Sequence, residues 1–472
     1  MGASKRAALI VVGLLVFWSE LIGQTPPTAG PSTRTFTLVE AINYALANYP
    51  AIRAAQEQVA AARAGVSLAR TSYLPRTDSL WESNRATANN IFGLLLPQSV
   101  IPSISGPVLP VTSNRGVWGS ATGVLFTWEP FDFGYRGAKV DASRSAENLA
   151  QADVAVTHLE VAMAAADAFL TLAAAEQTVR AAQADMDRRE VFDKSVHVLV
   201  DNELRPGADA SRSDAELARA RITLIRAQQQ EQVSRAALAE ALGISGDVRI
   251  ETGQALTPPP ESTPAVSALS GHPVAAAQQA RVNEVRAQEH ILNRTDYPRF
   301  YFQSGIFGRG SGADPNGTFA TGLNGLGLER ENWAAEFTVM FPNLFDFAAL
   351  RAQKREEAAR EREEAARYDL TLQTLNTQVE QARAALEGAR RVAANTPVEL
   401  EAARASETQS RARYQAGLAT IVEVADAQAL LVQAEIDDAL ARLAVWHNLA
   451  SLAAAGGSLD PFLQLVQQAG GH

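Results

Sequence analysis

Cysteine is absent from this chain of 472 residues, and histidine occurs only six times. Without thiols the chain can form no disulfide, no thiolate metal site and no cysteine nucleophile, and it cannot be lipid-anchored through an N-terminal cysteine. Its 52 acidic and 42 basic residues leave a net charge of −10, with no basic cluster that would bind nucleic acid. Disulfide-stapled, thiol-dependent and nucleic-acid-binding proteins are therefore excluded as classes.

Motifs for catalysis are also missing. The histidines form neither an HExxH motif nor a pair at metal-ligand spacing, and they are His158, His197, His272, His290, His447 and His472. No Gly-x-Ser-x-Gly elbow occurs. The glycine-rich run 308–312 lacks the lysine and the strand–helix setting of a phosphate-binding loop, so we interpret it as a flexible loop between strands. We predict no enzyme, no cofactor and no bound metal.

The N-terminus has the pattern of a secretory signal, ending at about residue 24. Lys5 and Arg6 precede an apolar run at residues 7–18, which is too short to span a bilayer but suits a signal core. The alternative, a buried N-terminal helix, is disfavoured by the prolines that follow at once. No later stretch is long and apolar enough for a transmembrane helix. We therefore expect an exported protein that enters a membrane, if at all, as strands.

The strongest internal signal is a duplication. Three anchors recur in the same order, which indicates two copies of one plan. The first anchor is a helical segment between two prolines at the same spacing, from Asn48-Tyr49-Pro50 to Leu74-Pro75 and from Gly271-His272-Pro273 to Tyr297-Pro298. The second is the start of a long helix, Phe131-Asp132-Phe133-Gly134 and Phe345-Asp346-Phe347-Ala348. The third is a helix break, Pro206-Gly207 and Ala416-Gly417. We predict a first repeat at 36–255, a proline-rich linker at 256–270, a second repeat at 271–457 and a C-terminal tail at 458–472.

Each repeat is expected to contain one very long helix, at about 134–205 and about 348–416. Much of the apolar content is alanine, the best helix former and a poor core filler, which favours slim, closely packed helices. About 70 residues correspond to a helix of roughly 105 Å. The flanking helices of the first repeat, at 39–75 and 209–243, sum to nearly that length. A long helix beside two short helices stacked end to end would form the wall of a cylinder.

Between the helices lie segments that alternate with a period of two, at about 76–130 and about 299–342. Trp333 to Phe341 alternates apolar and mostly polar residues over roughly 26 Å, close to the ~25 Å apolar band of an outer-membrane barrel. Trp118 and Phe126 mark the same span in the first repeat, so these four aromatics are candidates for a barrel girdle. Four strands cannot close a barrel alone, whereas twelve strands from three chains would. The alternative is a soluble hairpin packed on its own helices.

These features, together with the segment from Tyr414 to Asp426, resemble the TolC-like outer-membrane efflux proteins over residues 36–457. The resemblance implies a mainly α fold with membrane β structure: a homotrimer with a twelve-stranded β-barrel on a periplasmic α-helical tube in a Gram-negative-type outer membrane. It also implies contact with outer-membrane lipid, a periplasmic adaptor protein and an inner-membrane pump. The function would be a passive exit duct of a tripartite efflux or type I secretion system. Some relatives carry an arginine at the position of Ala419.

The carboxylates near the two helix breaks are the functional candidates. Glu423 and Asp426 lie three residues apart on one helix face, and in a trimer they would form rings that favour cations at a narrow opening. Further candidates for the channel lining or the gate are Tyr414, Asp209 and Asp214, and Gly207 and Gly417 are expected to supply the turns. The alternative for the acids is that they complement helix dipoles.

The competing function is a secreted structural or adhesive coiled-coil protein without a pore. The aromatic-ended alternating strands discriminate between the two, because a pure coiled coil has no use for them.

Overall fold

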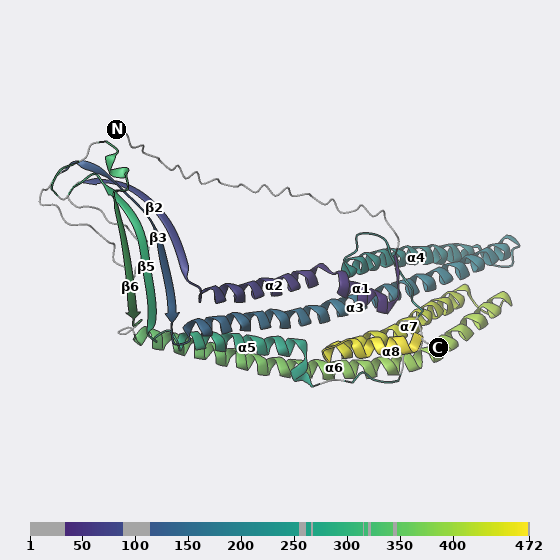
Figure 1. Cartoon of the computed structure of the whole chain (residues 1–472). Helices are drawn as coiled ribbons and strands as arrows, with labels where there is room; N and C mark the ends of the chain where they lie inside the picture. Colours follow the sequence, from purple (N-terminus) through teal and green to yellow (C-terminus); the bar gives the residue numbers. More distant parts are fainter. Residues whose placement is uncertain are drawn as a thin grey trace.

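The computed structural model describes residues 34–87, 114–253, 261–265, 268–314, 316–319, 322–342 and 347–470. The predicted signal segment, part of the linker and the Asp346 turn of the second repeat lie outside these residues. The molecule is elongated, with a curved sheet at one end and long helices running away from it (Figure 1).

The first repeat is built on α3 (Tyr135–Asp201), a helix of 67 residues. Helices α2 (Pro50–Thr71) and α4 (Gly207–Leu242) both pack along α3, and Figure 1 places them one after the other on it. The predicted arrangement of one long helix beside two short ones is confirmed.

The prediction of a single helix at 39–75 is wrong, because α1 (Leu38–Asn48) ends before α2 begins. Tyr49 is extended, with φ −65° and ψ 130°, as expected for a residue that precedes a proline. Pro50 then occupies the first position of α2, where its missing N–H costs no hydrogen bond.

The second repeat follows the same plan. Helices α5 (Pro273–Leu292) and α7 (Ile421–Ala455) pack along α6 (Phe347–Gln415), which has 69 residues. Because α3 also contacts α5 and α7, the two repeats lie side by side over much of their length. Pro397 lies inside α6, where it removes one backbone hydrogen bond, and Figure 1 shows α6 bending toward its C-terminal end.

The main core lies at mid-length, where α1, α3, α4, α7 and α8 (Asp460–Gly470) meet. Trp446 of α7 and Phe462 of α8 are fully buried and pack edge to face, with ring centroids 6.2 Å apart. The expected tail at 458–472 therefore contains a core helix. A two-stranded parallel sheet of β1 (Arg34–Phe36) and β4 (Val248–Ile250) borders this core.

The expectation that no later segment is apolar enough to span a membrane is wrong for α3. This helix is long and apolar enough by length and composition alone. Its central alanines, among them Ala165, Ala166 and Ala173, are fully buried in the mid-length core. Close helix packing within the chain thus accounts for part of the apolar stretch, of which 33% is buried, and alanine suits such packing because its small side chain lets helix axes approach.

Four antiparallel strands form the sheet at the other end, in the order β2 (Arg76–Thr87), β3 (Gly116–Phe131), β5 (Arg299–Ser311), β6 (Arg330–Met340). Strand β3 pairs with β5, so one hairpin from each repeat joins the same sheet. The prediction of a loop at 308–312 is wrong, because β5 continues to Ser311, and Gly308 and Arg309 pair with Glu331 and Arg330. In the described residues, β2 and β6 are edge strands with one side unpaired.

The two faces of this sheet differ in chemistry, as the alternation predicts. The exposed face carries large apolar side chains that share the register: Trp81, Val124, Ile306, Trp333 and Phe337. Trp333 is 79% exposed and Phe337 is 61% exposed. The opposite face is half-buried and mostly polar, with Asp78, Glu82, Gln303, Arg309, Glu336 and Thr338. The sheet therefore has one exposed, apolar face and one half-buried, mostly polar face.

A buried ion pair lies where the sheet meets the long helix α3. After β3 ends, Asp132 accepts hydrogen bonds from the backbone and guanidinium nitrogens of Arg136 at 2.7 and 2.8 Å. Arg136 also donates to the carbonyl of Ser72 at the end of α2, at 3.1 Å. The recurring Phe-Asp-Phe turn of the first repeat thus orients the long helix against the sheet.

Candidate functional site

The far end of the molecule, which we call the helical tip, consists of two helix–helix turns. Residues 202–206 join α3 to α4, and residues 416–420 join α6 to α7. Both turns place one residue in the left-handed region, Glu203 with φ 57° and Gly417 with φ 80°. In both, the next amide donates to a carbonyl five residues back: Leu204 to Leu199 at 2.9 Å, and Leu418 to Arg413 at 2.8 Å. The duplication is therefore visible in the turn backbone.

Gly417 has the predicted role, but the prediction for Gly207 is wrong. Gly207 is the first residue of α4 and has no positive φ. The first turn closes four residues earlier, on Glu203, because α3 ends at Asp201 and Pro206 serves as the N-cap of α4.

Tyr414 joins the two turns within one chain. Its hydroxyl donates to Asp209 Oδ2 at 2.9 Å, and its ring packs against Phe192 with centroids 5.4 Å apart. The guanidinium of Arg205 lies 4.2 Å from the centre of the same ring and donates to the Tyr414 carbonyl. We call Arg205, Asp209 and Tyr414 the tip latch.

Of the two roles expected for Tyr414, channel lining is wrong, because this residue is only 1% exposed, while a role in the gate stays a prediction. Burial, followed by the hydrogen bond to Asp209, raises the pKa of Tyr414 to about 12. At neutral pH the hydroxyl is therefore protonated and able to donate to the carboxylate.

Arg205 was not among the candidates from the sequence. When the repeats are aligned on their left-handed residues, Arg205 and Ala419 each follow two positions later, so they correspond. Ala419 is buried in a small apolar cluster with Phe192 and Tyr414. An alignment of the two repeats on their left-handed residues, Glu203 and Gly417, would have identified Arg205, whereas the alignment of Gly207 with Gly417 did not.

The two carboxylates at the start of α7 are both exposed. Thr420 and Glu423 form a capping box, with the Thr420 amide donating to Glu423 Oε1 at 3.1 Å. Arg413 lies 3.9 Å from the same carboxylate. Glu423 thus stabilises the helix start, while Asp426 lies one turn further on the same side. Their placement in a channel opening stays a prediction.

Asp209 and Asp214 are not brought together. Asp209 lies in the first turn of α4 and accepts from Tyr414, whereas exposed Asp214 lies 3.2 Å from His197 Nε2 of α3. The hydrogen bond that His197 donates to Asp214, together with the charges of Asp193 and Asp201, raises the pKa of the exposed His197. Sequence reasoning missed His197 and Asp193, although their i,i+4 spacing places both on one helix face.

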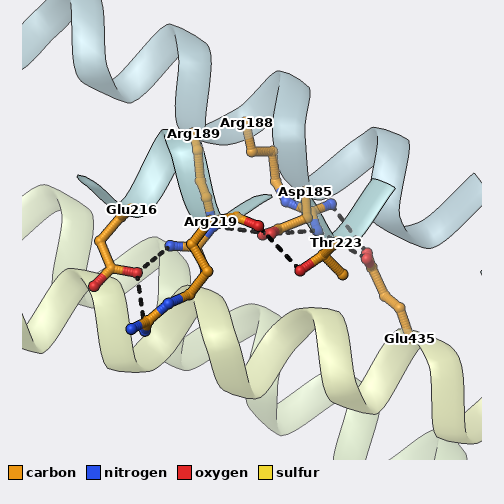
Figure 2. A network of polar contacts seen from close by, with 7 residues as sticks. All are labelled: Asp185, Arg188, Arg189, Glu216, Arg219, Thr223 and Glu435. Atoms are coloured by element: carbon orange, nitrogen blue, oxygen red, sulfur yellow. Dashed lines mark hydrogen bonds and ion pairs between the residues drawn. The ribbon is translucent and has the colours of Figure 1, made fainter. Parts of the chain in front are cut away.

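Behind the tip, a polar network connects three helices (Figure 2). Arg188 of α3 binds Glu435 of α7 through two hydrogen bonds of 3.2 and 2.9 Å. Arg189 pairs with Asp185 at 2.8 Å and with Glu216 of α4 at 3.4 Å. Since Asp185 and Arg189 are both buried, removing Arg189 would leave the Asp185 carboxylate with only the more distant Arg188, at 4.0 Å, as an ion-pair partner among the described residues. The network ties the first repeat to the second next to the tip.

At the sheet, three of the four girdle candidates share one face. Trp118, Phe126 and Trp333 occupy positions of the exposed face by register, with Trp118 and Phe126 half-buried. Phe341 lies just beyond the end of β6 and is exposed. Contact with lipid stays a prediction for all four.

Comparison with known proteins adds to this geometry. The family model described as Outer membrane efflux protein matches residues 41–244 and 265–458. Protein CyaE of Bordetella pertussis is 26% identical over 289 residues, which cover 58% of this chain and 55% of that protein. The chain thus spans little more than half the length of this curated relative.

Two solved structures illustrate the shared fold. CusC, described as forming a transmembrane channel, has a TM-score of 0.73 at 16% identity, covering 89% of this chain and 92% of its own. The outer membrane protein VceC of Vibrio cholerae has a TM-score of 0.67 at 18% identity, covering 90% of this chain and 97% of its own.

Proposed function

The chain belongs to the outer membrane efflux protein family, and on this premise we propose that three copies form a passive exit duct of a tripartite efflux or type I secretion system. Membership of this family places the chain in the outer membrane. The observation that carries the proposal is the open four-stranded sheet, with exposed aromatic residues on one face, polar residues on the other and two unpaired edges.

This sheet is incomplete in a single chain. An open edge facing lipid would leave backbone N–H and C=O groups without partners, which costs several kcal/mol each in hydrocarbon. Three sheets joined from β6 of one chain to β2 of the next would give twelve strands and no edge. Trp333 and Phe337 would then face lipid, while Glu336 and Thr338 would face the lumen. Trp118, Phe126, Trp333 and Phe341 would provide the aromatic residues at the membrane interfaces.

The helices would form the wall of a tube in the periplasm. At 67 residues, α3 is roughly 100 Å long, a reach that suits contact with a periplasmic adaptor protein and an inner-membrane pump. Several large apolar side chains of these helices are exposed in the single chain, and a trimer interface would cover them: Val191, Val198, Ile222, Ile225, Val392 and Val398.

The helical tip would serve as the gate. The tip latch holds the α6–α7 turn against the α3–α4 turn, so widening the opening by moving one turn would break the contacts of Tyr414 with Arg205 and Asp209. Three copies of Glu423 and Asp426 would surround the opening with carboxylates, which attract cations.

Two measurements on the full chain in detergent test this function. Light scattering should give the mass of a trimer, and planar bilayers should show single-channel conductance. A monomer that stays soluble without detergent would contradict the duct, and a trimer without conductance would favour the alternative of a structural coiled-coil protein.

A further inference from the structure

Three side chains with metal-binding atoms converge between α3 and α4, near the helical tip. Asp193 and His197 lie one turn apart on α3, and Asp214 faces them from α4. His197 Nε2 lies 3.2 Å from Asp214 Oδ1 and 3.8 Å from Asp193 Oδ1. One ligand atom from each of the three residues lies within 4.8 Å of the others. Among the described residues, no other such group of three occurs.

Asp193 is the unusual member of this cluster. It is only 9% exposed, and its Oδ1 has no hydrogen-bond partner in the described part of the chain. A buried carboxylate oxygen without a hydrogen-bond partner is destabilising, and a bound cation would compensate for the missing contact. This oxygen points toward the histidine nitrogen that Asp214 also faces. The buried atom therefore needs a partner at the place where the three groups meet.

We propose that Asp193, His197 and Asp214 bind a divalent transition-metal ion of the zinc type. Zinc binds imidazole nitrogen and carboxylate oxygen in tetrahedral geometry at about 2.0–2.2 Å, which separates neighbouring ligand atoms by about 3.3–3.6 Å. The two distances from His197 Nε2, 3.2 and 3.8 Å, are close to this range, and the ligand atoms of the two aspartates lie within 4.8 Å of each other, so the three groups would draw together around a bound ion. An imidazole ligand disfavours Ca²⁺ and Mg²⁺, which prefer oxygen.

The surroundings support a cation at this place. The charged groups with the largest effect on His197 are acidic: Asp193, Asp201 and Asp214. The partial exposure of His197 and Asp214 gives an ion access from solvent and leaves room for water as a further ligand. A bound ion links α3 to α4, because one ligand comes from α4 and two come from α3. All three ligand groups come from one chain.

Isothermal titration of the metal-free, full-length protein in detergent with ZnCl₂ tests the site. We expect one Zn²⁺ per chain, and a loss of affinity of at least about tenfold in His197→Ala, because even residues that only support metal ligands contribute about 10–100-fold. His447→Ala is the matched control, since His447 lies 3.2 Å from Asp167 but belongs to no three-residue cluster in the described chain. It should bind Zn²⁺ as the parent does.

A second variant separates ligand loss from misfolding. Asp214→Asn alters an exposed residue, keeps its shape and removes the anionic ligand. In this variant the metal-free melting temperature should stay close to that of the parent, while the rise in melting temperature caused by Zn²⁺ should disappear. Equal concentrations of Mg²⁺ should leave the parent unchanged. Zn²⁺ binding that persists in both variants, or a parent that binds none, overturns the proposal, and neither result bears on conductance.

Discussion

The two ends of the molecule differ in how they treat their large side chains: the sheet end exposes them, and the tip end buries them. The sheet end exposes its largest apolar side chains, such as Trp333 and Phe337, and leaves two strand edges unpaired. The tip end buries Tyr414 and satisfies it with Asp209 and Arg205 from the other repeat of the same chain. The difference teaches that the contacts of Tyr414 at the tip are made within one chain, whereas the proposed barrel would complete the sheet only with lipid and further copies. Substitutions at the tip should therefore act on a single chain, and those at the sheet on the assembly.

The largest effect is expected at the buried network behind the tip. Arg189→Met leaves the carboxylate of Asp185 buried without its 2.8 Å partner, which should cost about 3–5 kcal/mol of unfolding free energy. Denaturant unfolding followed by far-UV circular dichroism measures this loss. Arg180→Met is the control, because its partner Glu176 lies 3.7 Å away and Arg180 is mostly exposed, so it should cost about 1 kcal/mol at most. Equal losses of unfolding free energy in the two variants would mean that the buried network adds nothing to stability beyond an exposed ion pair.

At the sheet, the two faces should respond differently to charge. Phe337→Arg on the proposed lipid face should cost about 2–4 kcal/mol near the bilayer midplane, whereas Thr338→Arg on the polar face should be tolerated. Unfolding by urea from lipid vesicles, together with the yield of trimer, measures the difference. If both variants are equally damaged, the sheet is buried on both faces and is not a barrel wall.

The tip latch should act on gating rather than on assembly. Tyr414→Phe removes a hydrogen bond to a charged acceptor, worth about 1.5–3 kcal/mol. Single-channel recordings should therefore show at least about tenfold longer open times, with Arg205→Ala acting in the same direction. Tyr44→Phe provides the control, because its hydroxyl accepts from Arg34 far along the chain from the tip. Unchanged gating in a folded Tyr414→Phe trimer would contradict the latch.

The carboxylates of α7 should set ion selectivity. Glu423→Gln with Asp426→Asn removes the charges while an amide retains the capping contacts of Glu423. Cation preference and block by divalent ions in planar bilayers should fall, and trimer assembly should persist. Selectivity that matches the parent would place both acids outside the opening.

The smallest effect is the pH dependence at His197. Its pKa is raised in the folded chain, chiefly by the hydrogen bond that it donates to Asp214. This pair therefore stabilises the fold below about pH 6.5, and the gain is lost as pH rises through the higher folded value. With a chelator present to remove metal ions, the melting temperature should fall slightly as pH rises over that window. Asp214→Asn should abolish this fall. Zn²⁺ affinity should rise over the same window, because the metal needs the neutral imidazole.

Much of the fold was predictable because its signals are local. The alternation of Trp333 to Val339 defines a strand with two faces, and Pro50 and Pro273 mark helix starts. The errors also have local causes. Tyr49 ends a helix because it precedes proline, and Glu203 takes the left-handed position that a glycine was expected to occupy.

The candidate site was predictable only in part. The acids Glu423 and Asp426 follow from the turn at Gly417, but Tyr414 proved to be buried and Asp214 faces a histidine. Arg205 contacts Tyr414 across 209 residues of sequence, and Arg188 contacts Glu435 across 247. No periodicity within a helix determines such a partner.

By itself, the sequence determined the element types, the duplication and the polarity of the strand faces, because each depends on residues within a few positions of one another. The tertiary structure alone decided which helix faces meet. In alanine-rich helices such as α3, many faces are similarly small and apolar, so the pattern leaves the rotation of each helix open. Packing of α3 against α4 and α7 settles that rotation, and with it the tip latch, the buried network and the meeting of Asp193, His197 and Asp214.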